Sequence, residues 1–308
     1  MNILYIFFTM FLSMTGFSAG ESLLTHEARV NGFGSIKYRP PLVESNETPV
    51  VLFHGIYGGA SHRTWRHLVP ELDAAGRAVF LMDLPGVGES DKPKRSYDIE
   101  DFDAFVEGFL VEVVGTSANL ISESILSNGV LRVAADRPDL VHRVAILNPS
   151  GIGSLRNPPS QRQQSLYDRY YNNDAEAKVF YRNLLRDNSL RYFLAFGFYD
   201  DSLIDDGLLA DFRILQGNLD QRFISLSFIG GQLFRSFEES SKNVFTPVIA
   251  IFGAEYEAFQ NNPITRASDF SAVRPEFNYV EIQGSGSAVQ RERPLELSVK
   301  LLDFFADD

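Results

Sequence analysis

The chain has 308 residues, 44% of them hydrophobic, and a formal net charge of −12 without any long basic run. This charge argues against a nucleic-acid partner, because neutralising phosphates requires clustered Lys and Arg. The sequence contains no cysteine, which excludes disulfides, thiolate catalysis and metal sites built on cysteine.

The first segment, residues 1–20, has an apolar, uncharged run that stops near Phe17 and is followed by the small residues Ser18, Ala19 and Gly20. The run is shorter than the roughly 20 residues of a membrane span. We interpret the segment as a signal peptide that makes the protein secreted or periplasmic, with the mature chain starting near Gly20 or Glu21. An uncleaved N-terminal anchor is the alternative, because no Lys or Arg precedes the run. We expect no membrane span after signal removal.

Strands and helices are expected to alternate from Arg29 onward. Apolar runs typical of buried strands lie at residues 49–53, 78–83, 118–122, 143–148, 247–252 and 279–282. After Asp98, apolar residues recur at helical spacing until Gly115, which predicts a capped helix. A second helix is expected to run to about Asp136, and the last to begin near Pro294. The alternation indicates an α/β fold with a mostly parallel sheet flanked by helices.

Residues 151–242 differ from the rest of the chain. They are rich in Tyr and Phe and show helical patches without a convincing strand. We predict a helical cap here, inserted after the strand that ends at Asn148, with the core domain formed by residues 21–150 and 243–308. The aromatic residues are consistent with ordinary packing of small helices or with an aromatic ligand cage.

Four stretches carry a family resemblance: "HGIYGGASHRTWRHLVPEL" from His54, "DLPGVGESDKP" from Asp83, "NLISESILSNG" from Asn119, and "EIQGSGSAVQRERP" from Glu281. In this order they resemble the α/β-hydrolase fold family, capped subgroup, over nearly the whole chain outside the insertion. The resemblance implies an α/β-hydrolase fold with a cap over its pocket, and a catalytic Ser, His and acid at fixed places.

The nucleophile of this family lies on a sharp strand-to-helix turn between small residues. Ser124 takes that slot, fourteen positions before Pro138, although Leu126 is larger than the slot usually holds. Ser127 is the alternative register. The resemblance also implies an oxyanion hole made by the backbone N–H groups of Ile125 and of Ile56 or Tyr57.

The acid slot is irregular. After Gly253 the family usually shows an Asp, but Tyr256 falls in that position, and Glu255 or Glu257 could substitute after a small shift. Both glutamates are equally consistent with solvated loop residues. A second acid position used by some relatives holds Asn148, whose amide cannot stabilise an imidazolium by charge.

The histidine slot is vacant. Ser287 stands where the resemblance calls for the catalytic histidine, inside a kept frame of Gly284, Gly286 and the Glu292-Arg293-Pro294 tail. We place His54 in the His-Gly structural motif. His62 and His67 are expected near the pocket mouth, and His62 is the candidate replacement base. The expected pocket residues are therefore His54, His62, Glu123 and Asn148.

Three functions remain open. The first is a pseudohydrolase that binds a small apolar molecule or an ester-like ligand. The second is a lyase, isomerase or cyclase that uses Ser124, Glu123, Tyr57 or Tyr256 for proton transfer or orientation. The third is a serine esterase with Ser124 as nucleophile and a non-standard base. We expect no cofactor and no metal, because no group of His and carboxylates shows ligand spacing.

Overall fold

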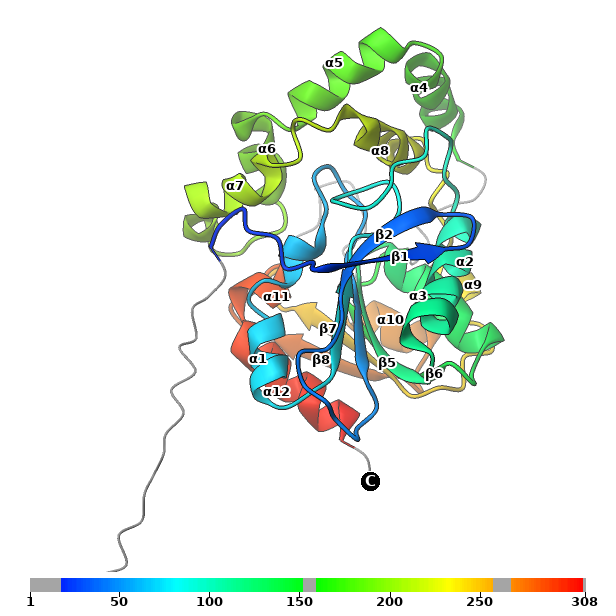
Figure 1. Ribbon diagram of the computed structural model, residues 1–308, viewed down its shortest axis with the longest axis vertical. Coiled ribbons are helices and arrows are strands. Elements are labelled where there is room, and N and C mark those ends of the chain that lie inside the picture. Colours follow the sequence, from blue (N-terminus) through cyan, green and yellow to red (C-terminus); the bar gives the residue numbers. More distant parts are fainter. Residues whose placement is uncertain (1–17, 152–158, 257–266, 307–308) are drawn as a thin grey trace, which may run out of the picture.

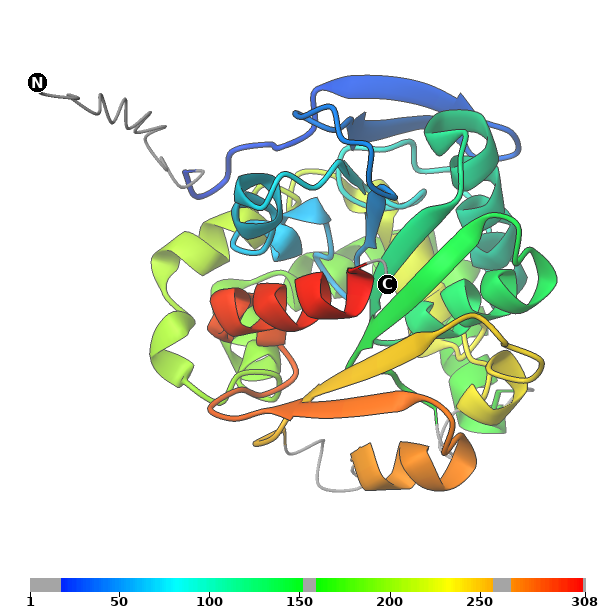
Figure 2. The same cartoon turned by 90° about the horizontal axis from the view of Figure 1, so that it is seen from below.

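The computed structural model describes residues 18–151, 159–256 and 267–306. Within them the strands form one sheet in the order β1-β2-β4-β3-β5-β6-β7-β8. Helices cover both faces of this sheet, as Figures 1 and 2 show from two sides. The strands are β1 (His26–Val30), β2 (Gly34–Arg39), β3 (Val50–Phe53), β4 (Val79–Met82), β5 (Ala118–Glu123), β6 (Val141–Leu147), β7 (Val248–Gly253) and β8 (Asn278–Ile282).

The helices follow in chain order, with η marking 3-10 or π turns. They are η1 (His62–Trp65), α1 (Val69–Ala74), α2 (Ile99–Phe109), η2 (Leu110–Val114), α3 (Leu126–Asp136), α4 (Gln161–Tyr171), α5 (Asp174–Leu184), α6 (Asp187–Leu194), η3 (Asp201–Leu203), α7 (Asp206–Arg213), η4 (Leu219–Gln221), α8 (Arg222–Ile229), α9 (Phe237–Ser240), α10 (Ala267–Val273), α11 (Val289–Glu292) and α12 (Pro294–Phe305).

Strands β3 to β8 pair in parallel, which confirms the predicted mostly parallel α/β sheet. The hairpin of β1 and β2 was not predicted, and it joins the sheet antiparallel through β4. His26 begins β1, and its ring lies 5.7 Å from that of Tyr38. The hairpin has mixed polar and apolar residues at an edge of the sheet, so no continuous apolar run marks it.

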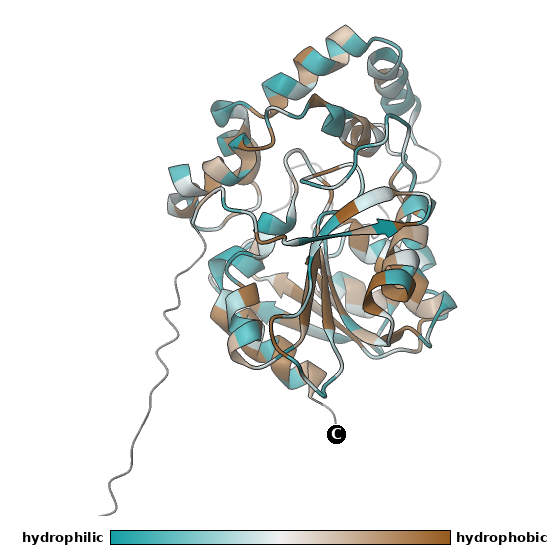
Figure 3. Ribbon diagram, viewed as in Figure 1, coloured by the Kyte–Doolittle hydropathy of each residue, from teal (hydrophilic) through white to brown (hydrophobic). Residues whose placement is uncertain are grey.

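The two faces of the sheet bury alternate residues of each strand. In β3, Val51 and Phe53 pack on the side of α2 and α3, whereas Val50 and Leu52 pack on the side of α1 and α12. Side chains alternate between faces along a strand, so a strand covered on both sides must be apolar throughout. Figure 3 shows this as central strands coloured hydrophobic along their length.

Helix α2 begins where the sequence predicts. The side chain of its N-cap, Asp98, accepts a hydrogen bond from the backbone N–H of Asp101, and Asp101 returns one, which makes a capping box. The helix then continues as one π turn, η2, until Gly115 ends it with φ 73°. A left-handed residue of this kind is the usual end of a helix and favours glycine.

The segment between β6 and β7 is helical, and α4 to α8 form an arch over the sheet domain (Figure 1). Its last helix, α9, instead packs into the sheet domain, where the Phe237 ring lies 4.5 Å from that of Phe270. Residues 1–17 of the expected signal peptide lie outside the described residues. Among the described residues no helix is both long and apolar enough to cross a membrane.

Candidate active site

Ser124 occupies the sharp turn between β5 and α3. Its φ is 55°, a left-handed conformation that costs energy for a residue with a side chain and that often occurs at functional sites. The Ser124 backbone N–H donates to the carbonyl of Leu147 at 2.9 Å, which ties the turn to β6. The Ser124 Oγ lies 3.4 Å from the Oγ of Ser150. The alternative register fails, because Ser127 is buried inside α3 and its Oγ accepts a hydrogen bond from Ser122.

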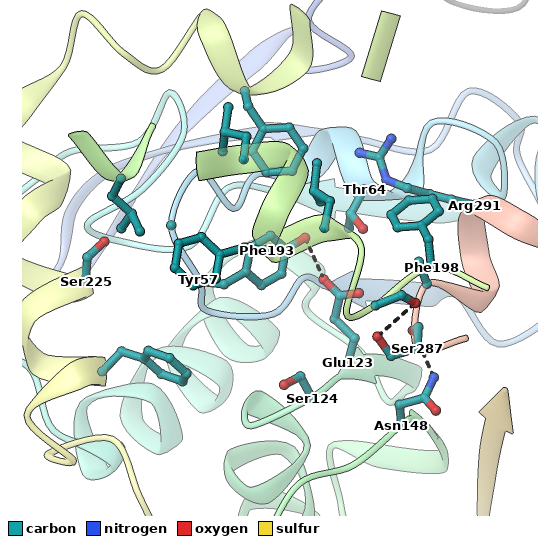
Figure 4. A pocket seen from close by; sticks show the side chains of 18 of the residues that line it. Tyr57, Thr64, Glu123, Ser124, Asn148, Phe193, Phe198, Ser225, Ser287 and Arg291 are labelled. Atoms are coloured by element: carbon teal, nitrogen blue, oxygen red, sulfur yellow. Dashed lines mark hydrogen bonds between the residues drawn. The ribbon is translucent and has the colours of Figure 1, made fainter. Parts of the chain in front are cut away.

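Ser124 faces a cavity of about 640 Å³ between the sheet domain and the helical arch (Figure 4). Residues after β3, β5, β6, β7 and β8 supply its floor, and α5 to α8 supply most of its apolar wall. The polar lining residues are Tyr57, Thr64, Glu123, Ser124, Asn148, Ser150, Asn183, Ser189, Ser225, Tyr256, Ser287, Gln290 and Arg291. The apolar lining includes Leu147, Phe180, Leu184, Leu190, Phe193, Leu194, Phe198, Phe212, Phe228, Ile229 and Ala288.

Of the residues expected to form the oxyanion hole, Tyr57 lines this cavity. The side chains of Ile56 and Ile125 are buried in the main core, 2% and 1% exposed. The implied oxyanion hole concerns their backbone N–H groups, and Ile125 directly follows Ser124 as the residue that caps α3. The hole stays a prediction.

Asn148 holds the loop that follows β8. Its Nδ2 donates to the carbonyl oxygen of Ser287 at 2.9 Å, and its Oδ1 accepts from the backbone N–H of Gly253 at 3.1 Å. Asn148 has φ 40°, so this is a second left-handed side-chain-bearing residue at the cavity. The amide thus joins the ends of β6 and β7 to the Ser287 loop, and it does so without a negative charge.

Ser287 lines the cavity, and the cap lies directly against it. The Ser287 Oγ donates to the carbonyl of Gly197 at 3.3 Å, and the Ala288 N–H donates to the same carbonyl at 3.1 Å. Glu292 strengthens the contact, because one of its carboxylate oxygens accepts from the N–H of Gly286 and the other from the N–H of Tyr199. The vacant histidine slot is therefore a place where core and cap meet.

The acid slot holds a phenol. Tyr256 lines the cavity, and burial raises the pKa of its hydroxyl. Glu255 turns toward the loop instead, where its Oε2 accepts from the N–H of Ser285 at 3.0 Å. Hydrogen bonds from the backbone of Gly284 and Ser285 lower the pKa of Glu255. Glu257 lies outside the described residues. Glu255 does not line the cavity, so its expected role as a catalytic acid has no support in this geometry.

The expected pocket histidines, His54 and His62, do not line the cavity. His62 is fully buried: its Nδ1 is 3.0 Å from Asp83 Oδ1, and its Nε2 accepts from the Leu23 N–H at 3.2 Å. His54 Nε2 accepts from the Leu84 N–H at 3.1 Å. The placement of His54 and His62 in the pocket is therefore wrong, because backbone groups and Asp83 already occupy their ring nitrogens. Neither is available as a base for Ser124.

The remaining histidines do not line the cavity either. His26 lies on β1, His67 follows η1, and His142 lies on β6 with its Nδ1 3.1 Å from Asn119 Oδ1. All five histidines of the chain belong to the described residues, and none lines the cavity. The cavity thus lacks the side chain that usually activates a serine.

Glu123 is the acidic group of the cavity, and it precedes Ser124 directly. Its Oε1 accepts from the Gly55 N–H at 2.7 Å and lies 3.4 Å from the Tyr57 hydroxyl. Its Oε2 accepts from the Nε2 of Gln290 at 2.5 Å, and that Nε2 also reaches Thr64. Figure 4 shows Glu123 pointing toward Tyr57 at the end of the cavity that also holds Thr64 and Arg291.

Sequence reasoning placed Glu123 in the pocket but missed its partners Thr64 and Gln290, and also Arg291. Both Gln290 and Arg291 lie inside the last of the four quoted stretches, between Ser287 and Glu292. Polar residues at the start of a helix next to a catalytic loop were the available signal. Their pairing with Glu123 spans 167 residues of sequence for Gln290, so only the fold reveals it.

Burial shifts the pKa of the Glu123 carboxyl group. It raises the pKa of Glu123 from its usual 4.5 to about 6, although the Gly55 N–H and the Arg291 guanidinium act in the opposite direction. Burial likewise raises the pKa of Tyr57, which the negative charge of Glu123 reinforces. A carboxyl group with a pKa near neutrality and a neutral phenol beside it are suited to proton exchange with a bound molecule.

This raised pKa predicts a pH-dependent stability. A carboxyl group whose pKa is higher in the folded state stabilises the fold below pH 4.5, and this contribution disappears as the pH rises through 6. The shift is equivalent to about 2 kcal/mol. We expect Glu123→Gln to remove about that much of the fall in unfolding free energy between pH 4.5 and 7, measured by urea unfolding.

Asp103 provides the comparison. Burial also raises its pKa to about 6, but it lies on α2, paired with Arg235, and does not line the cavity. Asp103→Asn should therefore also reduce the fall in unfolding free energy over this pH range, while leaving the cavity unchanged. An identical pH dependence in the wild-type chain and Glu123→Gln would show that Glu123 ionises normally.

One group of side chains has the spacing of a metal site. Among the described residues, ligand atoms of His62, Asp83 and Glu89 lie within 4.8 Å of one another. The geometry does not favour an ion, because both nitrogens of His62 already have partners and Asp83 accepts from the backbone N–H groups of His62 and Glu89. His62 and Asp83 therefore form a buried structural network, with exposed Glu89 at its edge.

Comparisons with known proteins show which sequences this chain resembles. A family model described as the alpha/beta hydrolase fold matches residues 48–180. Epoxide hydrolase A of Mycobacterium tuberculosis is 28% identical over 295 residues, which cover 83% of this chain and 89% of that protein. The dihydrolipoyllysine-residue acetyltransferase component of an acetoin cleaving system from Pseudomonas putida is 33% identical over 110 residues, but these cover only 36% of this chain and 29% of that protein.

Solved structures show the same fold. The structure of an epoxide hydrolase without ligand superposes with a TM-score of 0.69 at 22% identity, covering 91% of this chain and 97% of that chain. The parallel sheet, the Ser124 turn and the match of the family model lead to one conclusion. This chain has the α/β-hydrolase fold.

Proposed function

We propose that this protein is exported and binds a small, mostly apolar ligand in its capped cavity, without hydrolysis by a Ser-His-acid triad. One observation carries the proposal: none of the five histidines lines the cavity that Ser124 faces. A serine hydroxyl is a weak nucleophile unless a base accepts its proton. Loss of the histidine from a working serine triad costs about 10⁶ in kcat.

The cavity supports a ligand with one polar end. Glu123, Tyr57 and Arg291 lie at one end, whereas Phe180, Phe228 and other apolar side chains form much of the remaining wall. A volume of about 640 Å³ is in the range of small-molecule sites, which are mostly apolar with a few polar groups that orient the ligand. Similarity to proteins named as epoxide hydrolases supports a small substrate-like molecule as the occupant.

A non-hydrolytic reaction is the second candidate function, and Glu123 favours it. This carboxyl group is 6% exposed, has a raised pKa and contacts the Tyr57 hydroxyl inside the cavity. A lyase, isomerase or cyclase needs a group that moves a proton at the ligand, and a pKa near the working pH suits that task. Ser124 would then orient the ligand by hydrogen bonding rather than attack it.

A ligand titration tests the proposal. We expect 2-naphthol, which has one hydroxyl and two apolar rings, to bind saturably with one molecule per chain. Ser189 lines the cavity from α6, so Ser189→Trp should fill part of the volume and weaken binding by at least about tenfold, or 1.4 kcal/mol. Isothermal titration calorimetry measures both quantities.

Ser202→Trp is the matched control. Ser202 is exposed on η3 and does not line the cavity, so its substitution should leave the affinity unchanged. Equal affinities of wild-type chain, Ser189→Trp and Ser202→Trp would place the bound molecule elsewhere. Rapid, stoichiometric labelling of Ser124 by a fluorophosphonate would contradict the other half of the proposal, since it requires an activated hydroxyl.

A further inference from the structure

The segment after the expected signal peptide is fixed between the core and the cap. Figure 1 shows it starting beside α7 of the arch and running from there to β1. Leu23 is 3% exposed and packs into the core on the side of α1 and α12, and its N–H donates to His62. The side chain of Arg66, just after η1, donates to the carbonyl oxygens of Ser18 and Glu21. The segment is therefore part of the folded structure.

Gly20 is the centre of this contact. Its backbone N–H donates to Asp211 Oδ1 at 2.9 Å, and its carbonyl accepts from the Nη2 of Arg63 at 3.3 Å. Gly20 has φ 79°, which L side chains rarely adopt, and an added Cβ would lie 3.5 Å from Ile214 Cδ1. Glycine is thus the residue that this turn against α7 favours.

Asp211 is a buried carboxylate that links three elements. It is 3% exposed, and its two oxygens accept from Nε and Nη2 of Arg66 at 3.2 and 2.5 Å. The Nη1 of Arg291, from α11, lies 3.6 Å away. Phe212, the next residue of α7, lines the cavity. Any group that binds Asp211 therefore acts on the position of a cavity wall.

We propose that cleavage of the Ala19–Gly20 peptide bond creates an amino terminus that forms an ion pair with Asp211 and fastens the cap to the core. This inference rests on the proposed export. Hydrolysis adds one water: the leader leaves with a carboxylate on Ala19, and Gly20 gains an amine that is protonated at neutral pH. A charged donor at the place of a neutral N–H gives a stronger, charge-assisted hydrogen bond to the carboxylate.

The surrounding charges accommodate the new ammonium group. Arg66 and Arg291 already face Asp211, and Arg63 is paired with Glu89. His67 and Asp205 are the nearby titratable groups from the neighbouring elements, and burial lowers the pKa of His67. In the uncleaved folded chain, the Glu21 carboxylate accepts from the Ser18 N–H. The cleaved chain lacks that donor, so the Glu21 charge remains available beside the new amine.

The folded structure also sets the order of events. Gly20 N–H lies on buried Asp211 and the Ser18 carbonyl is bound by Arg66, so the scissile bond is held on both sides in the folded chain. A protease needs an extended, accessible segment. Cleavage must therefore precede folding of this region, as happens when a leader is removed during export.

The test uses the full chain, expressed with its leader in a bacterial host that exports proteins. Mass spectrometry of the purified product should show Gly20 as the first residue. Acetic anhydride at pH 7 then reports access to its amine, because only an unprotonated, accessible amine reacts. We expect acetylation of Gly20 to be at least about tenfold slower in the folded wild-type chain than in Asp211→Asn. Asp206→Asn, an exposed position on the same helix, should behave like the wild-type chain.

The outcomes are distinguishable. A product that keeps its leader would contradict both export and the proposed ion pair between the Gly20 amine and Asp211. Ligand binding is tested separately by the 2-naphthol titration. A product that begins at Gly20 but reacts equally fast in the wild-type chain and Asp211→Asn would overturn only the ion pair between the Gly20 amine and Asp211. If Asp211→Asn does not fold, the pH dependence of acetylation in the wild-type chain decides: the pKa of the Gly20 amine should lie above the usual value of about 8, and a lower pKa overturns the proposal.

Discussion

The double variant Ser287→His/Asn148→Asp is expected to hydrolyse p-nitrophenyl butyrate at least about 100-fold faster than the wild-type chain. Ser124 already has the strained turn of a nucleophile, with φ 55°. Asn148 already lies against the Ser287 loop, with 2.9 Å between its Nδ2 and the Ser287 carbonyl. An imidazole at 287 would supply the base, and a carboxylate at 148 would stabilise its charged form. A triad histidine is worth about 10⁶ in kcat, so even poor geometry should recover a measurable part.

The single variants separate the two contributions. Ser287→His alone should gain less, because an amide in place of the triad carboxylate lowers kcat by about 10⁴. Asn148→Asp alone should stay at background, and it should also lose about 1–3 kcal/mol of unfolding free energy. The reason is that a donor to the Ser287 carbonyl becomes a second acceptor facing it.

The cap is the obstacle to this gain. The Ser287 Oγ points to the Gly197 carbonyl at 3.3 Å, so an introduced imidazole must turn away from Gly197 and toward the cavity. Ser124→Ala in the double variant is the control and should abolish the gained activity. A folded double variant that is no faster than Ser287→His alone would mean that position 148 does not serve as the acid, and no gain in either would mean that position 287 is not the vacant slot.

The sequence predicted the parallel strands of the sheet but not the antiparallel hairpin at one edge. The runs that became β3, β5 and β7 are buried along their whole length, so each reads as a strand without reference to its neighbours. The hairpin of β1 and β2 gives no such signal, because its residues are mixed in polarity and only partly buried. Its place in the sheet depends on pairing with β4, which is a contact between distant parts of the chain.

In the candidate site, too, local sequence motifs predicted some residues correctly and failed for others. Ser124, Asn148 and Ser287 were placed by local motifs at the ends of strands, and the structure brings all three to one cavity. The error over His62 arose because sequence position near the pocket does not reveal burial. Its ring nitrogens are taken by Asp83 and by the backbone of Leu23, which lies 39 residues earlier. Non-local partners of this kind cannot be inferred from spacing.

Gly253→Ala is expected to lower the free energy of unfolding by about 3 kcal/mol, at the upper end for an overpacked site. An added Cβ at this position would lie 1.8 Å from the carbonyl oxygen of Gly286 and 2.5 Å from that of Ser285. Both neighbours are backbone atoms, so no side chain can rotate to relieve the contact. The last residue of β7 must therefore move away from the Ser287 loop, or the loop must move into the cavity.

Urea unfolding measures this effect, with Gly217→Ala as the matched control because an added Cβ there would meet nothing within 4 Å. The control should change the unfolding free energy by less than about 1 kcal/mol. The same displacement should weaken 2-naphthol binding at least tenfold, since Ser287 and Ala288 line the cavity and Gly253 anchors Asn148 through its N–H. Equal stability of the two variants would show that the Ser287 loop moves to make room for the added Cβ at little cost in free energy. The close approach of β7 to the loop would then not be what positions Ser287 opposite Ser124.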